Sequence, residues 1–346
     1  MEKILTVAVP CFNAEWCLDK CLSSFIDTPV QDLLEIIIIN DGSTDYTLEI
    51  ALKYQERYPN LFTVVDKENG GHGSGINVAV KMATGKYFKV VDSDDWVVTE
   101  NLEPFIDILK NTDVDVVLTH FYTENMVTGQ RQSFKTRDIP LGKIYSLDEF
   151  TKFHGNIYPC ASFHGLTYRT AVYRESKTVL SEGIFYEDQE YATLPFTKAQ
   201  TVLPLDLFIY EYLIGNANQS VSDNNQVKRL SHVEQVVCKL FECYHLSSNL
   251  SIGARKYISH KATELLLSYY VIALVKNSNK KEGRKEARRI RANMQLLGPE
   301  LVKDTNSRYR VALIMNFLGF NSKMLELMKL PLPYFIFRKL FKRNKG

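Results

Sequence analysis

Three aspartates stand within four residues at Asp92-Ser93-Asp94-Asp95, directly after the apolar run Tyr87 to Val91. Like charges this close repel one another unless a cation neutralises them. A hard divalent ion meets that need, because Mg²⁺ and Mn²⁺ take one or two protein carboxylates and complete their shell with phosphate oxygens and water. Asp-x-Asp alone is a weak signal, but its place after a predicted fourth strand strengthens it. The pattern predicts a Mn²⁺ or Mg²⁺ site that also holds a diphosphate.

Polar residues also follow the first three strand-like runs of the chain. In open α/β sheets, ligands lie beyond the carboxyl ends of the strands, so such residues are the first candidates for a binding site. These segments are Pro10-Cys11-Phe12-Asn13, Asn40-Asp41-Gly42-Ser43-Thr44-Asp45 and Asn69-Gly70-Gly71-His72-Gly73. We expect Asp41 to accept a hydrogen bond from a nucleobase N–H, because a carboxylate at a sheet end costs free energy unless its acceptor capacity is used. Ser43, Thr44 or Asp45 caps the next helix, and capping alone is the alternative for Ser43 and Thr44.

The glycines at positions 70, 71, 73 and 75 are candidates for cradling phosphates. They do not complete a dinucleotide-binding fingerprint, because Gly71-x-Gly73 is followed by Ile76 and Gly73-x-Gly75 by Val78. They also follow the third strand rather than the first, so a Rossmann dehydrogenase is not expected. For His72, contact with a ligand and packing within the loop stay open as equal alternatives.

Further along the chain, Glu187 and Asp188 follow two aromatic residues, Phe185 and Tyr186. An aromatic setting removes water, which raises a carboxyl pKa and prepares one of the pair as a general base. Taken alone, the two residues form an ordinary acidic pair, and a helix N-terminal cap is at least as good an interpretation.

The elements that must position these residues alternate between strands and helices. Short apolar or β-branched runs are predicted as buried strands at residues 4–9, 35–39, 62–66, 86–91 and 114–119. Helical apolar spacing fills the intervals at about 14–26, 44–57, 74–83 and 99–110. This alternation predicts an α/β domain with a largely parallel sheet over residues 1–120.

The rest of the chain divides into a loosely patterned part and a helical part. Between 121 and 222, short strands such as Gly165–Tyr168 and Val202–Tyr210 suggest a region that shapes an acceptor site, and Gly215–Ser222 is a candidate lid or an ordinary surface loop. Residues 223–346 show helical spacing and end in a basic, aromatic tail at 331–346 that has no acidic residue. That tail suits an anionic membrane surface, and packing on the chain itself or on a partner subunit is the equal alternative.

Composition limits the class of protein. With 346 residues and a formal net charge of +2, the chain can fill one or two domains and lacks the basic excess of a nucleic-acid-binding protein. Its six cysteines form no CxxC pair and show no metal-like spacing, which indicates reduced thiols. We find neither a secretory leader nor an apolar run of the ~20 residues that span a bilayer, so we expect a cytoplasmic protein.

Taken together, the motifs closely resemble those of glycosyltransferase family 2 over about residues 3–222. The matching segments, in order, are Pro10-x-Phe12-Asn13, Asn40-Asp41-Gly42-Ser43-Thr44-Asp45, Asn69-Gly70-Gly71, Ala83-Thr84-Gly85-Lys86-Tyr87, Asp92-Ser93-Asp94-Asp95 and Glu187-Asp188. The resemblance implies the GT-A fold, an inverting mechanism and a nucleotide sugar donor, commonly a UDP-sugar. It makes residues 1–222 the transferase domain and residues 223–346 a helical extension.

The resemblance also implies roles for single residues. The nucleotide-sugar-binding residues would be Pro10, Phe12, Asn13, Asp41, Asn69, Gly70, Gly71, His72, Asp92 and Ser93. Within that set, Asp41 would bind the base, and Asp92 would approach the ribose or the metal shell. Asp94 would ligate the Mn²⁺ or Mg²⁺ ion. Asp188 would deprotonate the acceptor hydroxyl, with Glu187 positioning Asp188 or contacting the acceptor.

The chain departs from the family pattern in three places. Phe12 stands where many relatives have tyrosine, so stacking on the base survives without a hydroxyl contact. Ile76 replaces a common arginine, whose contact would have to come from another residue, such as His72, Lys67 or Arg229. Gln226-x-x-Arg229-Leu230 only partly matches a signature of processive polymer synthases.

We therefore expect a metal-dependent hexosyl- or N-acetylhexosaminyltransferase that adds single sugars to a cell-surface or lipid-linked glycan at the inner face of the cell membrane. Whether it forms an oligomer stays open. A nucleotidyltransferase would carry a Gly-rich basic loop after the first strand, which residues 10–14 are not. The other alternative is a catalytically silent partner subunit that stabilises and anchors another glycosyltransferase, and the intact acidic motifs argue against it.

Overall fold

A computed structural model describes residues 2–153, 160–215, 223–247 and 249–328. The chain forms two compact units, one made of residues 1–219 and 246–258 and the other of residues 220–245 and 259–346. All the strands of the described residues lie in the first unit, as do the strand-end motifs and the acidic pair Glu187-Asp188.

The first unit is built on a ten-stranded sheet. Its strands are β1 (Leu5–Cys11), β2 (Leu34–Asp41), β3 (Phe62–Lys67), β4 (Tyr87–Val90), β5 (Trp96–Val97), β6 (Val116–Asn125), β7 (Arg131–Phe134), β8 (Tyr145–Ser146), β9 (Leu166–Arg169) and β10 (Thr201–Ile214). They follow the order β3-β2-β1-β4-β9-β6-β10-β5, with β7 beside β6 and β8 beside β10. Neighbours from β3 to β4 are parallel, β9 is antiparallel to both β4 and β6, and β10 runs parallel to β6. The predicted mostly parallel α/β sheet is confirmed.

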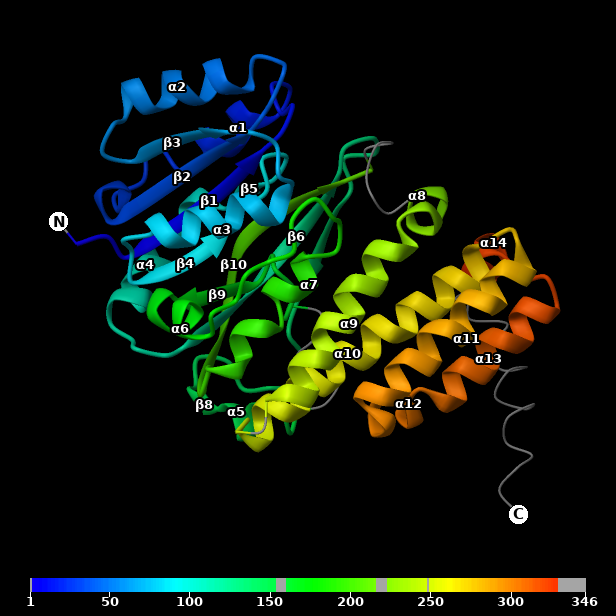
Figure 1. Ribbon diagram of the computed structural model, residues 1–346. Coiled ribbons are helices and arrows are strands. Elements are labelled where there is room, and N and C mark those ends of the chain that lie inside the picture. Colours follow the sequence, from blue (N-terminus) through cyan, green and yellow to red (C-terminus); the bar gives the residue numbers. More distant parts are fainter. Residues whose placement is uncertain (1, 154–159, 216–222, 248, 329–346) are drawn as a thin grey trace. The chain divides into compact units, whose positions relative to one another are not determined.

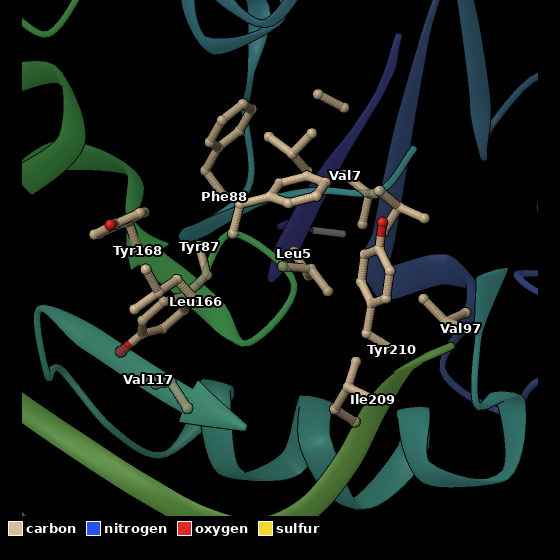
Figure 2. Packing of buried hydrophobic residues seen from close by; sticks show 14 of the residues in the cluster. Leu5, Val7, Tyr87, Phe88, Val97, Val117, Leu166, Tyr168, Ile209 and Tyr210 are labelled. Atoms are coloured by element: carbon tan, nitrogen blue, oxygen red, sulfur yellow. The ribbon is translucent and has the colours of Figure 1, made fainter. Parts of the chain in front are cut away.

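Apolar side chains on both faces explain why the central strands form a buried parallel sheet. All residues of β1 are buried, as are Ile36 to Ile39 of β2, and parallel strands covered on both faces read as such continuous apolar runs. Figure 2 shows Leu5 and Val7 of β1 packed in one cluster with Tyr87 and Phe88 of β4. Burying each large apolar side chain contributes about 1.5–3 kcal/mol.

Helices connect and cover these strands. Those that begin in the first unit are α1 (Leu18–Ser23), α2 (Thr47–Arg57), α3 (His72–Met82), α4 (Leu102–Lys110), α5 (Leu147–Phe150), α6 (Thr170–Glu175), α7 (Asp188–Tyr191) and α10 (Ile252–Val271). Helix α3 packs on β1 and β2, and α2 packs on β2 and β3 (Figure 1). The expected alternation of strands and helices is confirmed, although α1 is shorter than the predicted helix and β6 extends to Asn125.

One charged side chain lies inside this core. Lys89 of β4 is fully buried and donates hydrogen bonds to the backbone carbonyl oxygens of His164, at 2.7 Å, and Leu166, at 3.3 Å. Burial lowers the pKa of Lys89 from 10.5 to about 7, because a low-dielectric interior disfavours the charged form.

The pKa of Lys89 predicts how stability depends on pH. Between about pH 7 and 10.5 the unfolded chain keeps this proton while the folded chain releases it, so the Lys89 contribution to the free energy of unfolding increases with pH. Urea unfolding of the wild type and Lys89→Met at pH 7 and pH 9.5 measures this contribution by difference. We expect the wild type to gain stability relative to the variant at the higher pH. An unchanged difference would show that Lys89 titrates normally.

The second unit is helical, as its apolar spacing predicts. Its helices are α8 (Asp223–Lys228), α9 (Leu230–Leu246), most of α10, α11 (Lys280–Leu297), α12 (Pro299–Asp304), α13 (Asn306–Phe317) and α14 (Ser322–Met328). A π-helical turn at Ile272–Lys276 follows α10. Within the described part of the chain, no helix is both long and apolar enough to cross a bilayer. The predicted membrane-binding tail at 331–346 lies outside the described residues.

Candidate active site

The predicted motifs meet where the parallel strands β1, β2 and β4 end. Asn13, which follows β1, has a positive φ of 50° and accepts a hydrogen bond from the Thr44 backbone N–H at 2.9 Å. The Asn13 backbone N–H in turn donates to Ser43 Oγ at 3.0 Å. The loops after the first two strands are thus joined into one rim, and Ser43 and Thr44 stabilise that rim.

The acidic motif forms the centre of this edge. The carboxylate oxygens of Asp92, Asp94 and Asp95 all lie within 4.8 Å of one another. Asp95 is fully buried and accepts hydrogen bonds from Tyr210 Oη at 2.5 Å and from the Leu213 backbone N–H at 2.7 Å. Both carboxylate oxygens of Asp95 therefore bind β10 and are buried. Asp92 and Asp94 are partly exposed.

The charge balance of this motif matches the needs of a divalent cation. Burial, followed by the nearby Asp92 carboxylate, raises the pKa of Asp94 to about 6. Burial, and then the charges of Asp92 and Asp94, also hold the pKa of Asp95 well above its usual range. The candidate ligand group found among the described residues consists of carboxylates alone, which suits Mg²⁺ or Mn²⁺ completed by phosphate oxygens and water. The donor set thus fits the predicted ion.

The residues predicted to bind the base differ in accessibility. The Phe12 side chain is 54% exposed at the sheet edge, which leaves its ring free to stack on a ligand. Pro10 is buried within β1 and lies under helix α3, where it approaches the position that a Cβ of Gly75 would occupy. The Pro10 side chain is thus covered by protein, and its role in binding the base stays a prediction.

Asp41 holds the third loop in place. Its buried carboxylate accepts hydrogen bonds from Lys67 Nζ at 2.6 Å and from the backbone N–H groups of Gly70 and Gly71 at 2.9 and 2.7 Å. Asn69 Nδ2 donates to the Asp41 carbonyl oxygen at 2.8 Å. Lys67 thus pairs with Asp41. In this structure its ammonium group has a protein partner rather than the contact of the family arginine that Ile76 replaces. Base recognition by Asp41 stays a prediction.

The glycine run lies against the segment that carries Glu187. Gly71 has φ +86°, and a Cβ added to it would lie 2.8 Å from the Gly183 backbone nitrogen. A Cβ on Gly73 would lie 2.4 Å from the Ser181 carbonyl oxygen and 3.1 Å from Glu187 Cγ. The Gly183 N–H also donates to the Gly70 carbonyl oxygen at 2.8 Å. These glycines therefore let residues 180–187 approach the start of α3.

This close approach makes Gly73→Ala a sharp test of the packing. The added methyl group meets backbone rather than a flexible side chain, so we expect a loss of about 1–3 kcal/mol in the free energy of unfolding. Urea unfolding of Gly73→Ala and of the wild type measures the effect. Wild-type stability in Gly73→Ala would contradict the packing.

His72 joins two of the predicted motifs. Its Nε2 lies 2.8 Å from Asp92 Oδ1, and its Nδ1 lies 2.7 Å from Glu187 Oε1. Burial lowers the pKa of His72, but the two carboxylates, Asp92 first, outweigh burial and raise that pKa well above its usual range. The ring lies between the acidic motif and the acidic pair. His72 and Glu187 are 115 residues apart in the sequence.

The acidic pair begins the short helix α7. Glu187 is buried and precedes Asp188, but its side chain makes no capping hydrogen bond, so the cap interpretation fails for Glu187. Asp188 is partly exposed, and its Oδ2 accepts a hydrogen bond from Gln189 Nε2 at 2.7 Å. A partly exposed carboxylate beside a buried, paired one is a suitable arrangement for a general base.

Two residues of the site were missed by sequence reasoning. Glu190 is fully buried and accepts hydrogen bonds from Ser181 N–H at 2.8 Å and Ser181 Oγ at 2.6 Å, which closes the 181–190 loop. Tyr210, besides donating to Asp95, accepts a hydrogen bond from the Asp92 backbone N–H at 3.2 Å. Neither residue lies in a recognisable motif. Each contacts the site through tertiary hydrogen bonds, which the local sequence does not show.

The remaining sequence candidates lie elsewhere. Gln226 and Arg229 belong to the second unit, where Gln226 Oε1 accepts a hydrogen bond from Lys276 Nζ at 2.7 Å. The candidate lid at 215–222 lies outside the described residues apart from Gly215.

Comparison with known proteins gives this α/β fold a class. Over 92% of each chain, the structure superposes with a TM-score of 0.63 and 20% identity on residues 1–349 of TarS from S. aureus, solved in complex with UDP-GlcNAc. The fold is therefore GT-A-like. Residues 6–170 match the model of "Glycosyl transferase family 2". This segment therefore forms a domain of glycosyltransferase family 2.

Two curated relatives each match about three fifths of the chain. The uncharacterized glycosyltransferase EpsJ of Bacillus subtilis is 27% identical over 61% of this chain and 61% of its own length. The poly(ribitol-phosphate) β-glucosyltransferase of Bacillus spizizenii is 26% identical over 63% of this chain. The match spans only 33% of that second protein's length.

Proposed function

We propose that the protein is an inverting glycosyltransferase that moves a single hexosyl or N-acetylhexosaminyl group from a nucleotide diphosphate sugar to an acceptor hydroxyl. The observation that carries this proposal is that the His72 ring contacts both Asp92 and Glu187 at the carboxyl edge of the sheet. It brings an acidic motif suited to a cation and diphosphate beside a carboxylate pair suited to a general base.

The donor would lie along the rim formed by the first two loops. Phe12 would stack on the base, and Asn13, held by Ser43 and Thr44, would border it. The solved complex of TarS with UDP-GlcNAc supports a UDP-sugar as the donor. Asp92 and Asp94 would hold Mn²⁺ or Mg²⁺, and Ser93 would face the donor between them. A bound ion would offset the negative charge that develops on the departing diphosphate.

The transfer itself needs a base on the acceptor side. The Asp188 carboxylate would remove the proton of the acceptor hydroxyl as its oxygen forms a bond to the anomeric carbon. The bond from that carbon to the diphosphate breaks at the same time, and the nucleoside diphosphate leaves with the electron pair. Attack from the side opposite the leaving group inverts the anomeric centre.

The acceptor would be a cell-surface or lipid-linked glycan. A relative that acts as a poly(ribitol-phosphate) β-glucosyltransferase supports an acceptor of the cell-wall type. We further propose that the protein works at the cytoplasmic face of the membrane and that residues 331–346 contact that face. The basic and aromatic composition of this tail supports the contact.

A thermal-shift screen against UDP-, GDP- and dTDP-sugars, with and without Mn²⁺, tests the proposal. We expect one nucleotide class to raise the melting temperature only when the metal is present, and the matching sugar nucleotide to be hydrolysed slowly without an acceptor. If no nucleotide shifts the melting temperature and no donor is consumed, a catalytically silent partner subunit becomes the better account.

A further inference from the structure

His72 is placed to control the geometry of two separate functional segments. It is the first residue of α3, and its ring nitrogens contact Asp92 in the turn after β4 and Glu187 in the loop before α7. We propose that His72 is a positioning residue, which fixes the donor-side carboxylate Asp92 and the base-side carboxylate Glu187 relative to each other. This role differs from the nucleotide-sugar contact predicted for it from sequence.

The hydrogen bonds of the two carboxylates point to this role. In the part of the chain that the structure describes, the His72 ring is the single hydrogen-bond partner of the Asp92 side chain and of the Glu187 side chain. The Glu187 side chain is only 6% exposed, so water cannot replace that partner. Losing the ring would leave a buried carboxylate unsatisfied, which costs far more than losing an exposed contact.

The loop that carries Glu187 has an anchor that is independent of His72. Asn77, one and a half turns further along α3, donates from Nδ2 to the Leu180 carbonyl oxygen at 2.9 Å and accepts from the Leu180 N–H at 2.8 Å. The Gly183 N–H bonds the Gly70 carbonyl oxygen as well. Because these backbone contacts already dock the loop on α3, the His72 contacts act on the orientation of the two carboxylates.

The functional consequence rests on the proposed transferase activity. Asp92 belongs to the donor and metal side, and Glu187 directly precedes the proposed base Asp188. A rigid link between them would hold the acceptor hydroxyl in line with the bond that breaks, and misplacement by about 1 Å can cost about 100-fold in rate. His72 would thus couple the two halves of the reaction.

We call the two contacts of His72, one with Asp92 and one with Glu187, the bridge. Two substitutions remove one contact each. The amide nitrogen of asparagine stands at the same bond distance from Cγ as Nδ1 of histidine, and that of glutamine stands one bond further, like Nε2. His72→Asn therefore keeps a donor for Glu187 and loses the contact with Asp92. His72→Gln keeps a donor for Asp92 and loses the contact with Glu187. His245→Asn and His245→Gln, at an exposed position of α9, are matched controls.

Steady-state kinetics with a UDP-sugar and Mn²⁺ should separate the two halves. We expect His72→Asn to raise KM for the donor, and to weaken Mn²⁺-dependent UDP binding in calorimetry, by about 10- to 100-fold. We expect His72→Gln to lower kcat by a similar factor while UDP affinity stays at the wild-type value. If the two variants change the same parameter equally, or if neither differs from the His245 controls, the proposal is wrong.

A thermal double-mutant cycle tests the bridge without relying on activity. If the bridge exists, His72→Ala and Glu187→Ala combined will lower the melting temperature by less than the sum of the single effects. Additive effects would overturn the bridge even in an active enzyme. Non-additive effects in a protein that neither binds nor consumes nucleotide sugars would leave the bridge standing and refute the proposed function.

Discussion

Replacing Asp188 by asparagine is expected to lower the rate of sugar transfer by about 10²- to 10⁴-fold, which is the contribution typical of a general base. Asparagine keeps the shape of the side chain and cannot take a proton from the acceptor hydroxyl. Asp188 is partly exposed and starts a helix of only four residues, so the change should leave the fold intact. Initial rates at saturating donor and acceptor measure the loss.

Binding separates this effect from damage to the site. UDP affinity in the presence of Mn²⁺ should stay at the wild-type value in Asp188→Asn, because the base acts on the acceptor side. Asp107→Asn, which changes an exposed aspartate on α4, should be fully active. Transfer by Asp188→Asn at the rate of that control would remove Asp188 from the mechanism and direct attention to Glu187.

The second large effect is expected at the acidic motif. Asp94→Asn should lower transfer by about 10²- to 10³-fold, because stabilisation of a leaving diphosphate by a bound ion is worth several kcal/mol. The same variant should bind Mn²⁺ weakly in titrations followed by electron paramagnetic resonance. Its melting temperature without metal should not fall, since Asp94 is partly exposed and removing its charge relieves repulsion from Asp92.

The neighbouring aspartate supplies the contrast. Asp95 accepts hydrogen bonds from Tyr210 and Leu213, so Asp95→Asn introduces an amide where only acceptors fit and should lower the melting temperature. A pair of variants in which Asp94→Asn unfolds early and Asp95→Asn loses only metal would reverse our assignment of structural and ligating roles.

Sequence patterns could predict the edge of the sheet on which the site lies. The residues that follow apolar strands must gather where parallel strands end, and this predicts that Asn13, Asp41 and Asp92 lie at one edge of the sheet. The same reasoning predicted β1 to β4 closely, because strands buried on both faces have nearly continuous apolar sequences.

The contacts between those residues could not be predicted. Nothing in the local sequence shows that Gly73 must admit Ser181 or that His72 meets Glu187, because these pairs are more than 100 residues apart and the meeting depends on how the 180–187 loop folds back. Asp41 illustrates a different limit. A polar residue at a strand end is expected to face a ligand, and the sequence does not show that the Asp41 carboxylate also accepts hydrogen bonds from Lys67, Gly70 and Gly71.

Calorimetric titration of UDP into the wild-type protein, Asp94→Asn and Asp107→Asn, each with and without Mn²⁺, tests the proposed nucleotide-sugar site. We expect UDP binding that requires the metal, occurs at one site per chain, and is lost in Asp94→Asn but kept in Asp107→Asn. Metal-independent binding of equal strength in all three proteins, or no binding of UDP or any other nucleoside diphosphate, would contradict a metal-assisted nucleotide-sugar site at Asp92-Ser93-Asp94.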